Sequence, residues 1–409
     1  MVESGHPARE EDAPAPDRFH RGTNQTGMRQ LNERLVLTLL RRFGPMPKSA
    51  IARLTGLSAQ TVSVIMRALE AEGLLTKGDP VRGKVGQPSV PMALNPDGAY
   101  FIGLKLGRRS ADVVLTGFTG KVIGQVHKTY PWPEPDMVSA FTVSAIAELA
   151  QSLPADHRQR VSGLGVAMPF QMWEWTEAMG APEAVIDAWR HADIRADIAA
   201  ATGLPVYLQN DASAACNAEL VFAPETAPRD FLYFYIGFFA GGGVVLSGML
   251  YAGHSGNAGA LGSMPVVGRD GKLCQLIDVA SLRTLERALT GAGHEASSLY
   301  ASTRDWSADP AILEDWLDGA GFGLAQAILA SASVIDFSAA IIDGWMPEHV
   351  RQRLVASTRR HFARLNRAGT EPLDIREGSV GPNARALGAA TLPLAERFLT
   401  GQPAPAMEG

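Results

Sequence analysis

The chain has 409 residues, of which 46% are hydrophobic and 19% are charged. At roughly 100–200 residues per domain, this length predicts two or three domains with large apolar cores, and it excludes a wholly disordered chain. No apolar run reaches the ~18 residues that a membrane span requires. The first twenty residues are polar and rich in Pro and Ala, so we expect no signal peptide and a disordered tail over residues 1–25.

The chain contains two cysteines, Cys216 and Cys274. Two thiols cannot form a disulfide framework, and this usage indicates a reducing, cytoplasmic compartment. They also exclude a four-cysteine zinc site within one chain. We expect both to pack as small buried hydrophobic side chains. We predict no bound metal, no cofactor and no membrane partner for this chain.

Charge is distributed unevenly along the chain. The net charge is −5, but residues 20–90 hold eleven basic and four acidic residues, a net charge of +7 that leaves −12 for the remainder. A basic module joined to an acidic body is typical of a DNA-binding head on a larger domain. A solvated basic face without a nucleic-acid partner would give the same charge. Charge alone therefore does not distinguish it from a DNA-binding head, and the residue pattern is needed.

The basic segment has the pattern of a winged helix-turn-helix. Helices are expected over residues 28–43, 48–54 and 59–71, with a tight turn at 55–57 and Ser58 as the N-cap of the third helix. The expected buried positions of the first helix are Leu31, Leu35 and Leu39, with Val36, Leu40 and Phe43 beside them, and Ile51 and Leu54 point inward from the second. Strands from residue 74 and over 90–94 enclose a Gly- and Pro-rich loop, which predicts a basic wing.

The third helix has the character of a recognition helix. It buries Val62, Ile65, Met66 and Leu69, and its outer face is small and polar, which allows close approach to base edges, with Arg67 able to reach a guanine or a phosphate. A three-helix domain used for protein contacts is the alternative. The expected DNA contacts are Lys48, Ser58, Ala59, Gln60, Thr61, Ser63 and Arg67, with Arg82, Lys84 and Gln87 in the wing.

After a linker at 95–98, the pattern changes to that of an α/β protein. Three β-like runs over 99–107, 111–118 and 121–126 predict a meander. Further helices are expected over 137–153, 187–202, from 210, and over 279–290, 311–334, 347–367 and 382–399, with strands at 161–168, 205–209, 231–237, 242–248 and 337–342. The repeated order predicts two related lobes around a ligand cleft, the second starting at 231. Gly241–Gly243 is expected to form a turn or a phosphate-binding loop.

Over residues 26–400 the sequence resembles the ROK family (repressor, ORF, kinase), and most closely its repressor branch. The resemblance rests on GKVGQPSVPMALNP, LPVYLQNDASAACNAE, YIGFFAGGGVVLSGMLYAGHSGNAGALGSMPV and IREGSVGPNARALGAATLPL. It implies an α/β fold class: an N-terminal winged helix-turn-helix at 26–95 followed by a two-lobed, actin-like ATPase, sugar-kinase-like ROK domain at 98–405. The small lobe would span about 98–215 plus the C-terminal helix, and the large lobe about 216–385.

The chain departs from the kinase members of this family at the positions that the resemblance implies are functional. Lys105 stands where the kinases have the phosphate-loop Asp, and Ala260 and Ser263 replace a sugar-binding Glu and His. The cysteine-rich zinc loop is reduced to Cys274. Asn210-Asp211 matches the pair that supplies the kinases' general base, so Asp211 is a vestigial base, a partner of a sugar hydroxyl or merely a helix cap.

The sequence therefore predicts a DNA-binding regulator, a repressor of sugar uptake or catabolism genes, with no enzyme activity. Its body would sense a sugar-like effector through Asn210, Asp211, Gly256 and Asn257, whereas His254 would serve loop structure. A homodimer or homotetramer would bind an inverted-repeat operator in double-stranded DNA. Two alternatives remain: an active ATP-dependent sugar kinase with an accessory DNA-binding head, and a body that only dimerises.

Overall fold

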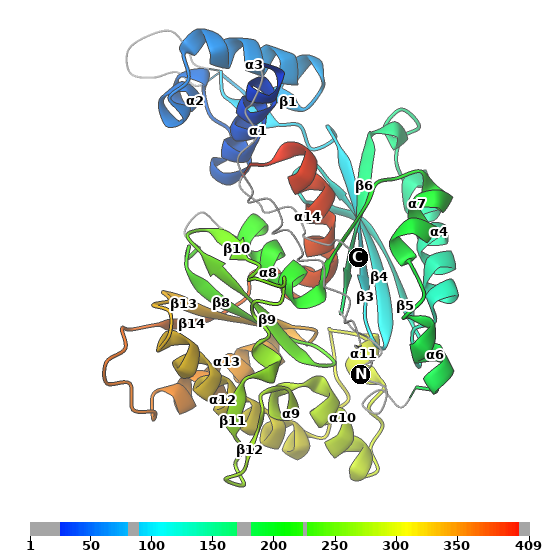
Figure 1. Cartoon of the computed structure of the whole chain (residues 1–409), viewed down its shortest axis with the longest axis vertical. Coiled ribbons are helices and arrows are strands. Elements are labelled where there is room, and N and C mark those ends of the chain that lie inside the picture. Colours follow the sequence, from blue (N-terminus) through cyan, green and yellow to red (C-terminus); the bar gives the residue numbers. More distant parts are fainter. Residues whose placement is uncertain (1–24, 81–89, 170–180, 224–226, 401–409) are drawn as a thin grey trace, which may run out of the picture.

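The computed structural model describes residues 25–80, 90–169, 181–223 and 227–400. The expected tail over residues 1–24 and the expected wing contacts Arg82, Lys84 and Gln87 lie outside the described residues. Figure 1 shows three parts arranged around one central helix: a small helical head, a first sheet and a second sheet. None of the helices in the described part of the chain is both long and apolar enough to span a bilayer.

The head consists of three helices and a short hairpin. Its elements are α1 (Gln25–Phe43), α2 (Lys48–Thr55), α3 (Ala59–Ala71), β1 (Leu75–Lys77) and β2 (Met92–Leu94). Strands β1 and β2 pair antiparallel, and backbone hydrogen bonds between Met46 and Met92 join the hairpin to the segment before α2. Gly56 ends α2 at φ 70°, a left-handed conformation that glycine adopts without strain. The predicted helix-turn-helix order is confirmed.

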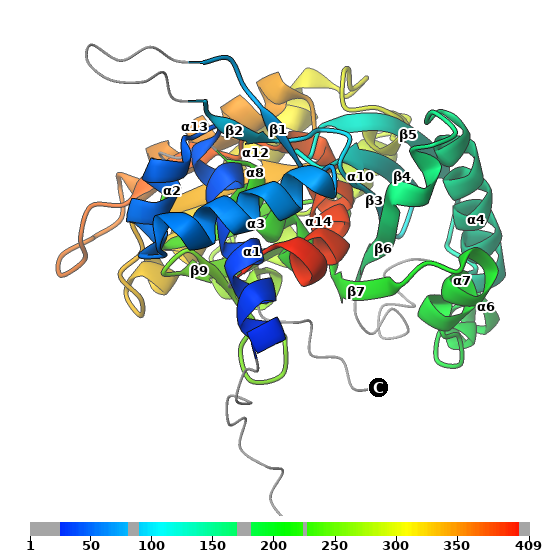
Figure 2. The ribbon, with the colours of Figure 1, turned by 90° about the horizontal axis from the view of Figure 1, so that it is seen from above.

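The predicted buried face of α1 is partly wrong. Leu31 and Phe43 are 47% and 38% exposed, and the buried side chains are Val36, Leu37 and Leu40. Leu31 is exposed because the first turns of α1 project beyond the helices on which the rest of α1 packs (Figure 2), whereas Phe43 lies at the other end of the helix. Leu54, expected to point inward, is 53% exposed at the end of α2.

The first sheet has the strand order β5-β4-β3-β6-β7. Strands β3, β4 and β5 form the predicted antiparallel meander, and β6 and β7 run parallel to β3. Helices α4 and α7 pack on this sheet, with α6 nearby (Figure 1). The bounds are β3 (Tyr100–Leu106), β4 (Ser110–Gly117), β5 (Val122–Thr129), α4 (Pro135–Gln151), β6 (Val161–Met168), α6 (Glu183–Ala188), α7 (Ile194–Thr202) and β7 (Val206–Asn210).

The second sheet repeats this topology as β10-β9-β8-β13-β14. Helix α8 packs on one face through the β8 side chains Phe231 and Tyr233, whereas α12 and α13 bury Leu232 and Phe234 on the other. The repeat confirms the prediction of two related α/β units. The bounds are α8 (Asp211–Phe222), β8 (Phe231–Ile236), β9 (Ala240–Leu246), β10 (Met249–Tyr251), α12 (Pro310–Ala332), β13 (Ala339–Gly344), α13 (Glu348–Phe362) and β14 (Asp374–Glu377).

Several local predictions are wrong. The helix expected over 187–202 is two helices, α6 and α7, and the helix expected over 279–290 is interrupted at Ser281, whose hydroxyl accepts a hydrogen bond from the Ala240 N–H (2.9 Å). The sequence pattern did not predict the short strands β10 and β14 or the hairpin at residues 265–275. The remaining bounds are β11 (Pro265–Val267), β12 (Leu273–Gln275), α9 (Ile277–Ala280), α10 (Leu282–Gly291) and α11 (Ser298–Ala301).

The glycine run at 241–243 is also not a turn. It lies inside β9, paired with Tyr233–Tyr235 of β8, and the turn is formed by residues 237–239. These positions are glycine because neighbours occupy the space of a side chain. A Cβ at Gly243 would contact Cys216 of α8, and a Cβ at Gly242 would overlap Leu261.

Helix α14 (Ala384–Phe398) lies in the middle of the molecule, between the two sheets (Figure 1). It packs on β3 and β6 of the first sheet and on α8. Three glycines permit this approach, because a Cβ at Gly103, Gly165 or Gly388 would overlap a backbone carbonyl of Ala386, Ala389 or Ala214 respectively. The packing is therefore backbone against backbone, and it leaves no room for an added methyl group.

The head and the body share one hydrophobic core. Phe398 of α14 packs edge-on against Phe101 and Phe118 of the first sheet, with ring centroids 5.8 and 5.0 Å apart. The same cluster includes the buried side chains of α1, α2 and α3. The segment 95–98, expected from composition to be a linker, is hydrogen-bonded on both sides: the Asn95 amide donates to Gly73 O (2.7 Å) and the Phe118 N–H to Pro96 O (2.9 Å).

We predict that Gly388→Ala destabilises the whole protein. The added methyl group would overlap the Ala214 carbonyl, and overpacking of this kind costs about 1–3 kcal/mol. Gly291→Ala at the end of α10 is the matched control, because nothing lies within 4 Å of its Cβ position. Urea unfolding of both variants measures the difference. Equal stability of the two variants would contradict the packing described for α14.

Candidate DNA interface and effector cleft

The outer face of α3 is uncovered and polar. In Figure 2, which looks down on the head, α3 lies across the front of the other helices. Gln60 and Arg67 are exposed, Ser63 is half-buried, and the predicted inner stripe Val62, Ile65, Met66 and Leu69 is buried. The spacing of 60, 63 and 67 places these polar side chains on one helical face. Such a face can enter a major groove and read base edges.

The start of α3 is built as predicted. The Ser58 hydroxyl accepts a hydrogen bond from the Thr61 N–H (3.1 Å), and Ser58, Ala59 and Gln60 are exposed. The Arg67 Nε donates to the Ser63 carbonyl oxygen (3.2 Å), so the guanidinium lies back along the helix. Lys48 is exposed at the first position of α2, where it can reach a phosphate.

Sequence reasoning missed one residue of this face. Val64 lies on it between Gln60 and Arg67 and is 48% exposed. An exposed apolar side chain on a recognition helix can contact the methyl group of thymine. The signal was present in the sequence, because position 64 falls outside the buried i, i+3, i+4, i+7 stripe.

A buried ion pair lies at the end of β3, at the position that resembles the kinases' phosphate loop. Lys105 of β3 is buried, and its Nζ donates to Asp112 Oδ2 (3.1 Å) and to the Ser110 hydroxyl (2.6 Å). Burial lowers the pKa of the Lys105 ammonium to about 8. Burial alone would raise the pKa of Asp112, but Lys105 and His127 together hold that carboxyl well below its usual range.

The ion pair belongs to a network that joins the two sheets. His127 Nδ1 lies 2.5 Å from Asp112 Oδ1, and the imidazole stacks on Trp345, which follows β13, at a centroid distance of 5.7 Å. Two cation–π contacts lie nearby: Arg108 over Phe239 (4.4 Å) and Arg109 over Phe238 (5.4 Å). The turn after β3 therefore contacts the turn between β8 and β9.

Asp211, the predicted vestigial base, is engaged by a buried arginine. Arg385 in the first turn of α14 donates to Asp211 Oδ2 (3.1 Å), and its guanidinium lies over the Tyr235 ring (4.7 Å). Burial opposes the Arg385 charge, but Tyr235 and Asp211 raise its pKa above the ordinary value. Helix capping is performed by Asn210, whose Oδ1 accepts from the Ala212 and Ser213 N–H groups, and not by Asp211. Nothing in the sequence signals the Arg385–Asp211 pair.

The other expected effector residues lie in the loop after β10. Asn257 is exposed there, as are Ala260 and Ser263 at its end, and Gly256 has a φ of 77°. A Cβ at Gly259 would contact Gly243 of β9, so the loop packs on β9. The start of α8 borders the same strand, because a Cβ at Gly241 would lie 3.0 Å from Ala212. The start of α8, with Asn210 and Asp211, and the loop after β10 therefore lie against the same strand, β9.

The residues present do not fit the zinc that the kinase members of the family hold. Hairpin β11–β12 supplies one thiol, Cys274, and partial burial raises the pKa of this thiol, whereas zinc ligands are thiolates. In the described ranges, no three His, Cys, Asp or Glu side chains form a group that could hold a metal ion. Cys216 is buried, as expected, and Cys274 only partly so.

The chain thus joins a helix-turn-helix head to a body of two repeated α/β units, the architecture of a DNA-binding domain on a larger α/β domain. Residues 29–76 match the sequence model of winged helix-turn-helix DNA-binding domains, and residues 101–396 match that of the ROK family. The chain belongs to the ROK family.

Individual relatives are distant. The xylose repressor of Bacillus spizizenii is 24% identical over 243 residues, which cover 59% of this chain and 62% of that protein. The match thus spans less than two thirds of that relative's length. The solved structure of a ROK family transcriptional regulator homologous to the E. coli MLC protein has a TM-score of 0.64 at 22% identity, covering 91% of this chain and 97% of the other. A ROK glucokinase from Streptomyces griseus has a TM-score of 0.54 at 20% identity, covering 72% and 99%.

We predict that Arg67→Ala weakens specific DNA binding by about 1–3 kcal/mol, because a bidentate contact to a base is lost. Arg304→Ala, an exposed arginine of the body, is the matched control and should bind as the unchanged protein does. Fluorescence anisotropy with a selected DNA site measures the affinity. Identical titrations for Arg67→Ala and the control would reject the base-reading role.

We predict that Lys105→Met lowers the free energy of unfolding by about 3–5 kcal/mol, because it leaves the Asp112 carboxylate buried without its main cation. The double variant Lys105→Met/Asp112→Leu should lose less than the sum of the single variants. Arg190→Met, which removes one partner of the exposed pair with Asp187, should change stability by about 0.5 kcal/mol or less. If urea unfolding shows that the losses in unfolding free energy at positions 105 and 112 simply add, the two side chains do not interact and the ion pair is contradicted.

Proposed function

We propose that this protein is a sequence-specific transcriptional repressor of sugar uptake or catabolism genes, and that its catalytically degenerate body senses a sugar-like effector. It would act in the cytoplasm as a homodimer or homotetramer on an inverted-repeat operator. The domain division at 26–95 and 98–405 belongs to the same proposal. The observation that carries it is the polar face of α3 on a head whose core continues into α14.

The partly buried Asp211–Arg385 pair supplies a mechanism for sensing. A sugar hydroxyl that donates to Asp211 competes with Arg385 for the same carboxylate. Arg385 lies in the first turn of α14, and the far end of α14 packs on the head. A ligand that binds the two arrangements of α14 with different affinity shifts the population of DNA-competent heads. Asn210, Gly256 and Asn257 would supply further contacts to the sugar.

The experiment is a titration of the full chain against DNA from upstream of its own gene and of neighbouring genes. It is run near physiological salt with excess competitor DNA, because electrostatic binding depends steeply on salt. Each titration is repeated with a panel of monosaccharides, beginning with xylose, since the Bacillus spizizenii relative is named a xylose repressor. Specific binding that one sugar changes supports the proposal, and specific binding that ignores every sugar contradicts the sensing role.

We predict that Asp211→Asn abolishes the sugar response and leaves DNA affinity unchanged. The amide keeps a hydrogen-bond acceptor for Arg385 but removes the charge for which the sugar competes. Asp187→Asn, on the exposed helix α6, is the matched control and should respond as the unchanged protein does. Loss of DNA binding together with the sugar response would show instead that Asp211 maintains the fold.

The second candidate is an active sugar kinase with a DNA-binding head, and Asp211 is the observation that favours it. Against it stand the buried Lys105–Asp112 pair, which puts a cation where the resemblance implies a phosphate-loop carboxylate, and the exposed Ala260 and Ser263. ATP consumption with the same sugar panel tests it. Sugar-dependent turnover that Asp211→Asn abolishes would establish the kinase and overturn the non-enzymatic part of the proposal.

A further inference from the structure

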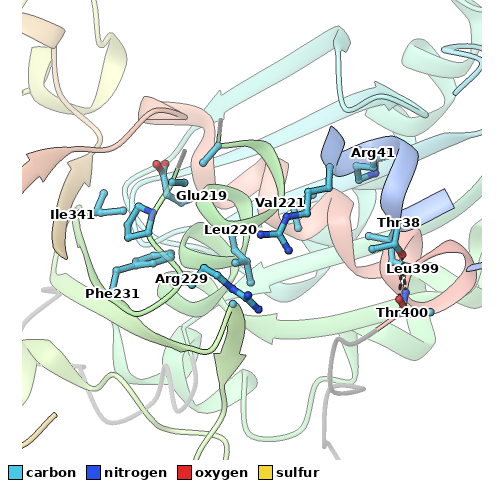
Figure 3. A pocket seen from close by; sticks show the side chains of 15 residues that line it. Thr38, Arg41, Glu219, Leu220, Val221, Arg229, Phe231, Ile341, Leu399 and Thr400 are labelled. Carbon is cyan, nitrogen blue, oxygen red and sulfur yellow. Dashed lines mark hydrogen bonds between the residues drawn. The ribbon is translucent and has the colours of Figure 1, made fainter. Parts of the chain in front are cut away.

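A second cleft lies at the junction between the head and the body, away from Asp211 and Lys105. Figure 3 shows Thr38 and Arg41 of α1 on one side, and Phe231 and Ile341 of the second sheet on the other. The end of α8 and the residues after α14 complete the walls. The cleft measures about 180 Å³, below the ~300–1,000 Å³ of sites for drug-sized ligands, so it suits a small molecule.

The cleft has three arginines, Arg41, Arg42 and Arg229. Arg42 and Arg229 are exposed, whereas Arg41 is half-buried and donates to the Phe118 carbonyl oxygen. One Arg229 nitrogen, Nη2, donates to the Ser247 carbonyl oxygen (3.1 Å). The buried Arg41 Nε has no hydrogen-bond partner among the described residues, and no carboxylate of the described chain forms an ion pair with any of the three. Burial lowers the pKa of Arg41 to about 10, which leaves it charged at neutral pH. Three guanidinium groups that no carboxylate of the described residues neutralises lie in this cleft, and such groups are suited to binding an anion.

The carboxylate of this cleft does not neutralise them. Glu219 near the end of α8 accepts hydrogen bonds from the backbone N–H groups of Ser379 (2.9 Å) and Val380 (3.3 Å). Its burial raises the pKa of the carboxyl, which weakens its charge further. The remaining wall is apolar, with Leu220, Phe231 and Leu399, and Thr38 and Thr400 place hydroxyls at its edge. The lining therefore fits a ligand with an anionic end and a short carbon skeleton.

We propose that this cleft binds a small organic phosphate, with Arg42 and Arg229 holding the phosphate group and Arg41 completing the donor set. A phosphate accepts several hydrogen bonds at once, and the planar guanidinium donates two in parallel, which makes arginine its preferred partner. The site is distinct from the sugar-sensing cleft, so it takes a second ligand.

This ligand would act on the position of the head. The Thr38 hydroxyl of α1 accepts a hydrogen bond from the Thr400 N–H (3.0 Å) just beyond α14, so both sides of the cleft meet at the head–body contact. A phosphate that binds Arg42 of the head and Arg229 of the body links the two parts directly. DNA affinity then depends on the ligand to the extent that the linked arrangement differs from the one on DNA. This regulatory part rests on the proposed function, whereas the binding part does not.

The binding part is tested without DNA, by isothermal titration calorimetry of the full chain in a phosphate-free buffer. The probes are ribose 5-phosphate, inorganic phosphate and pyrophosphate, with ribose as the uncharged match. We expect ribose 5-phosphate to bind and ribose not to bind at this site. Arg42→Gln/Arg229→Gln should weaken ribose 5-phosphate at least about tenfold, the loss of roughly one charge-assisted hydrogen bond.

The matched control is Arg304→Gln/Arg364→Gln, which removes the same charge from two exposed arginines far along the chain. It should change the affinity by no more than about twofold. The proposal is overturned if none of the three phosphate probes binds at about 10 mM. Any binding free energy would then be smaller than ~3 kcal/mol. Equal weakening by both double variants also overturns it, because the binding would then reflect net charge alone. The single variants Arg42→Gln and Arg229→Gln give the same ordering if the double variant fails to fold.

The regulatory part is tested by repeating the DNA titration with ribose 5-phosphate. A change in DNA affinity that Arg42→Gln/Arg229→Gln abolishes supports it. If calorimetry shows phosphate binding but DNA affinity does not change, the regulatory part is overturned and the phosphate-binding part is supported. Failure of the protein to bind any specific DNA would contradict the proposed function alone, since the calorimetry is independent of DNA.

Discussion

The arrangement of the molecule depends on the packing of α14 against backbone. Gly103 and Gly165 admit it onto the first sheet, and Gly388 admits it onto α8, so the helix contacts the first sheet and α8 without intervening side chains. Its first turn supplies Arg385 to the cleft, and Phe398 in its last turn enters the core shared with the head. One tightly packed helix therefore connects the Arg385–Asp211 pair to the core shared with the head.

The charged side chains around the end of β3 and the start of α14 pair with one another. Where the resemblance implies a carboxylate for metal and phosphate, the chain buries an ammonium, Lys105, and pairs it internally with Asp112. His127 and Trp345 extend that pair to the second sheet, and Arg385 neutralises Asp211. At positions that the resemblance implies are functional in the kinases, this chain pairs its charged side chains with one another. Such networks favour one relative position of the two sheets, because separating the paired groups would leave buried charges without partners.

The features that could be predicted from the sequence are those that local residue patterns determine. The helices of the head, the N-cap Ser58, the buried stripe of α3 and the repeated strand order all follow from periodicity and turn residues. The errors have tertiary causes. Leu31 is exposed because α1 extends beyond its packing partners. Gly242 and Gly243 are glycine because Leu261 and Cys216 fill the space beside their strand, and not because the chain turns there. The Arg385–Asp211 pair joins residues 174 positions apart, and no local pattern encodes such a contact.

The central claim is that the head and the body form one cooperative unit through the core around Phe398. Hydrogen exchange of the full chain under native conditions, followed by mass spectrometry, measures it directly, because it reports the opening free energy of each helix separately. The account predicts that the amides of α1 from Val36 onward open with the same free energy as those in the last two turns of α14. Rapid exchange throughout the head while α14 stays protected would show that the head unfolds alone, and would contradict it.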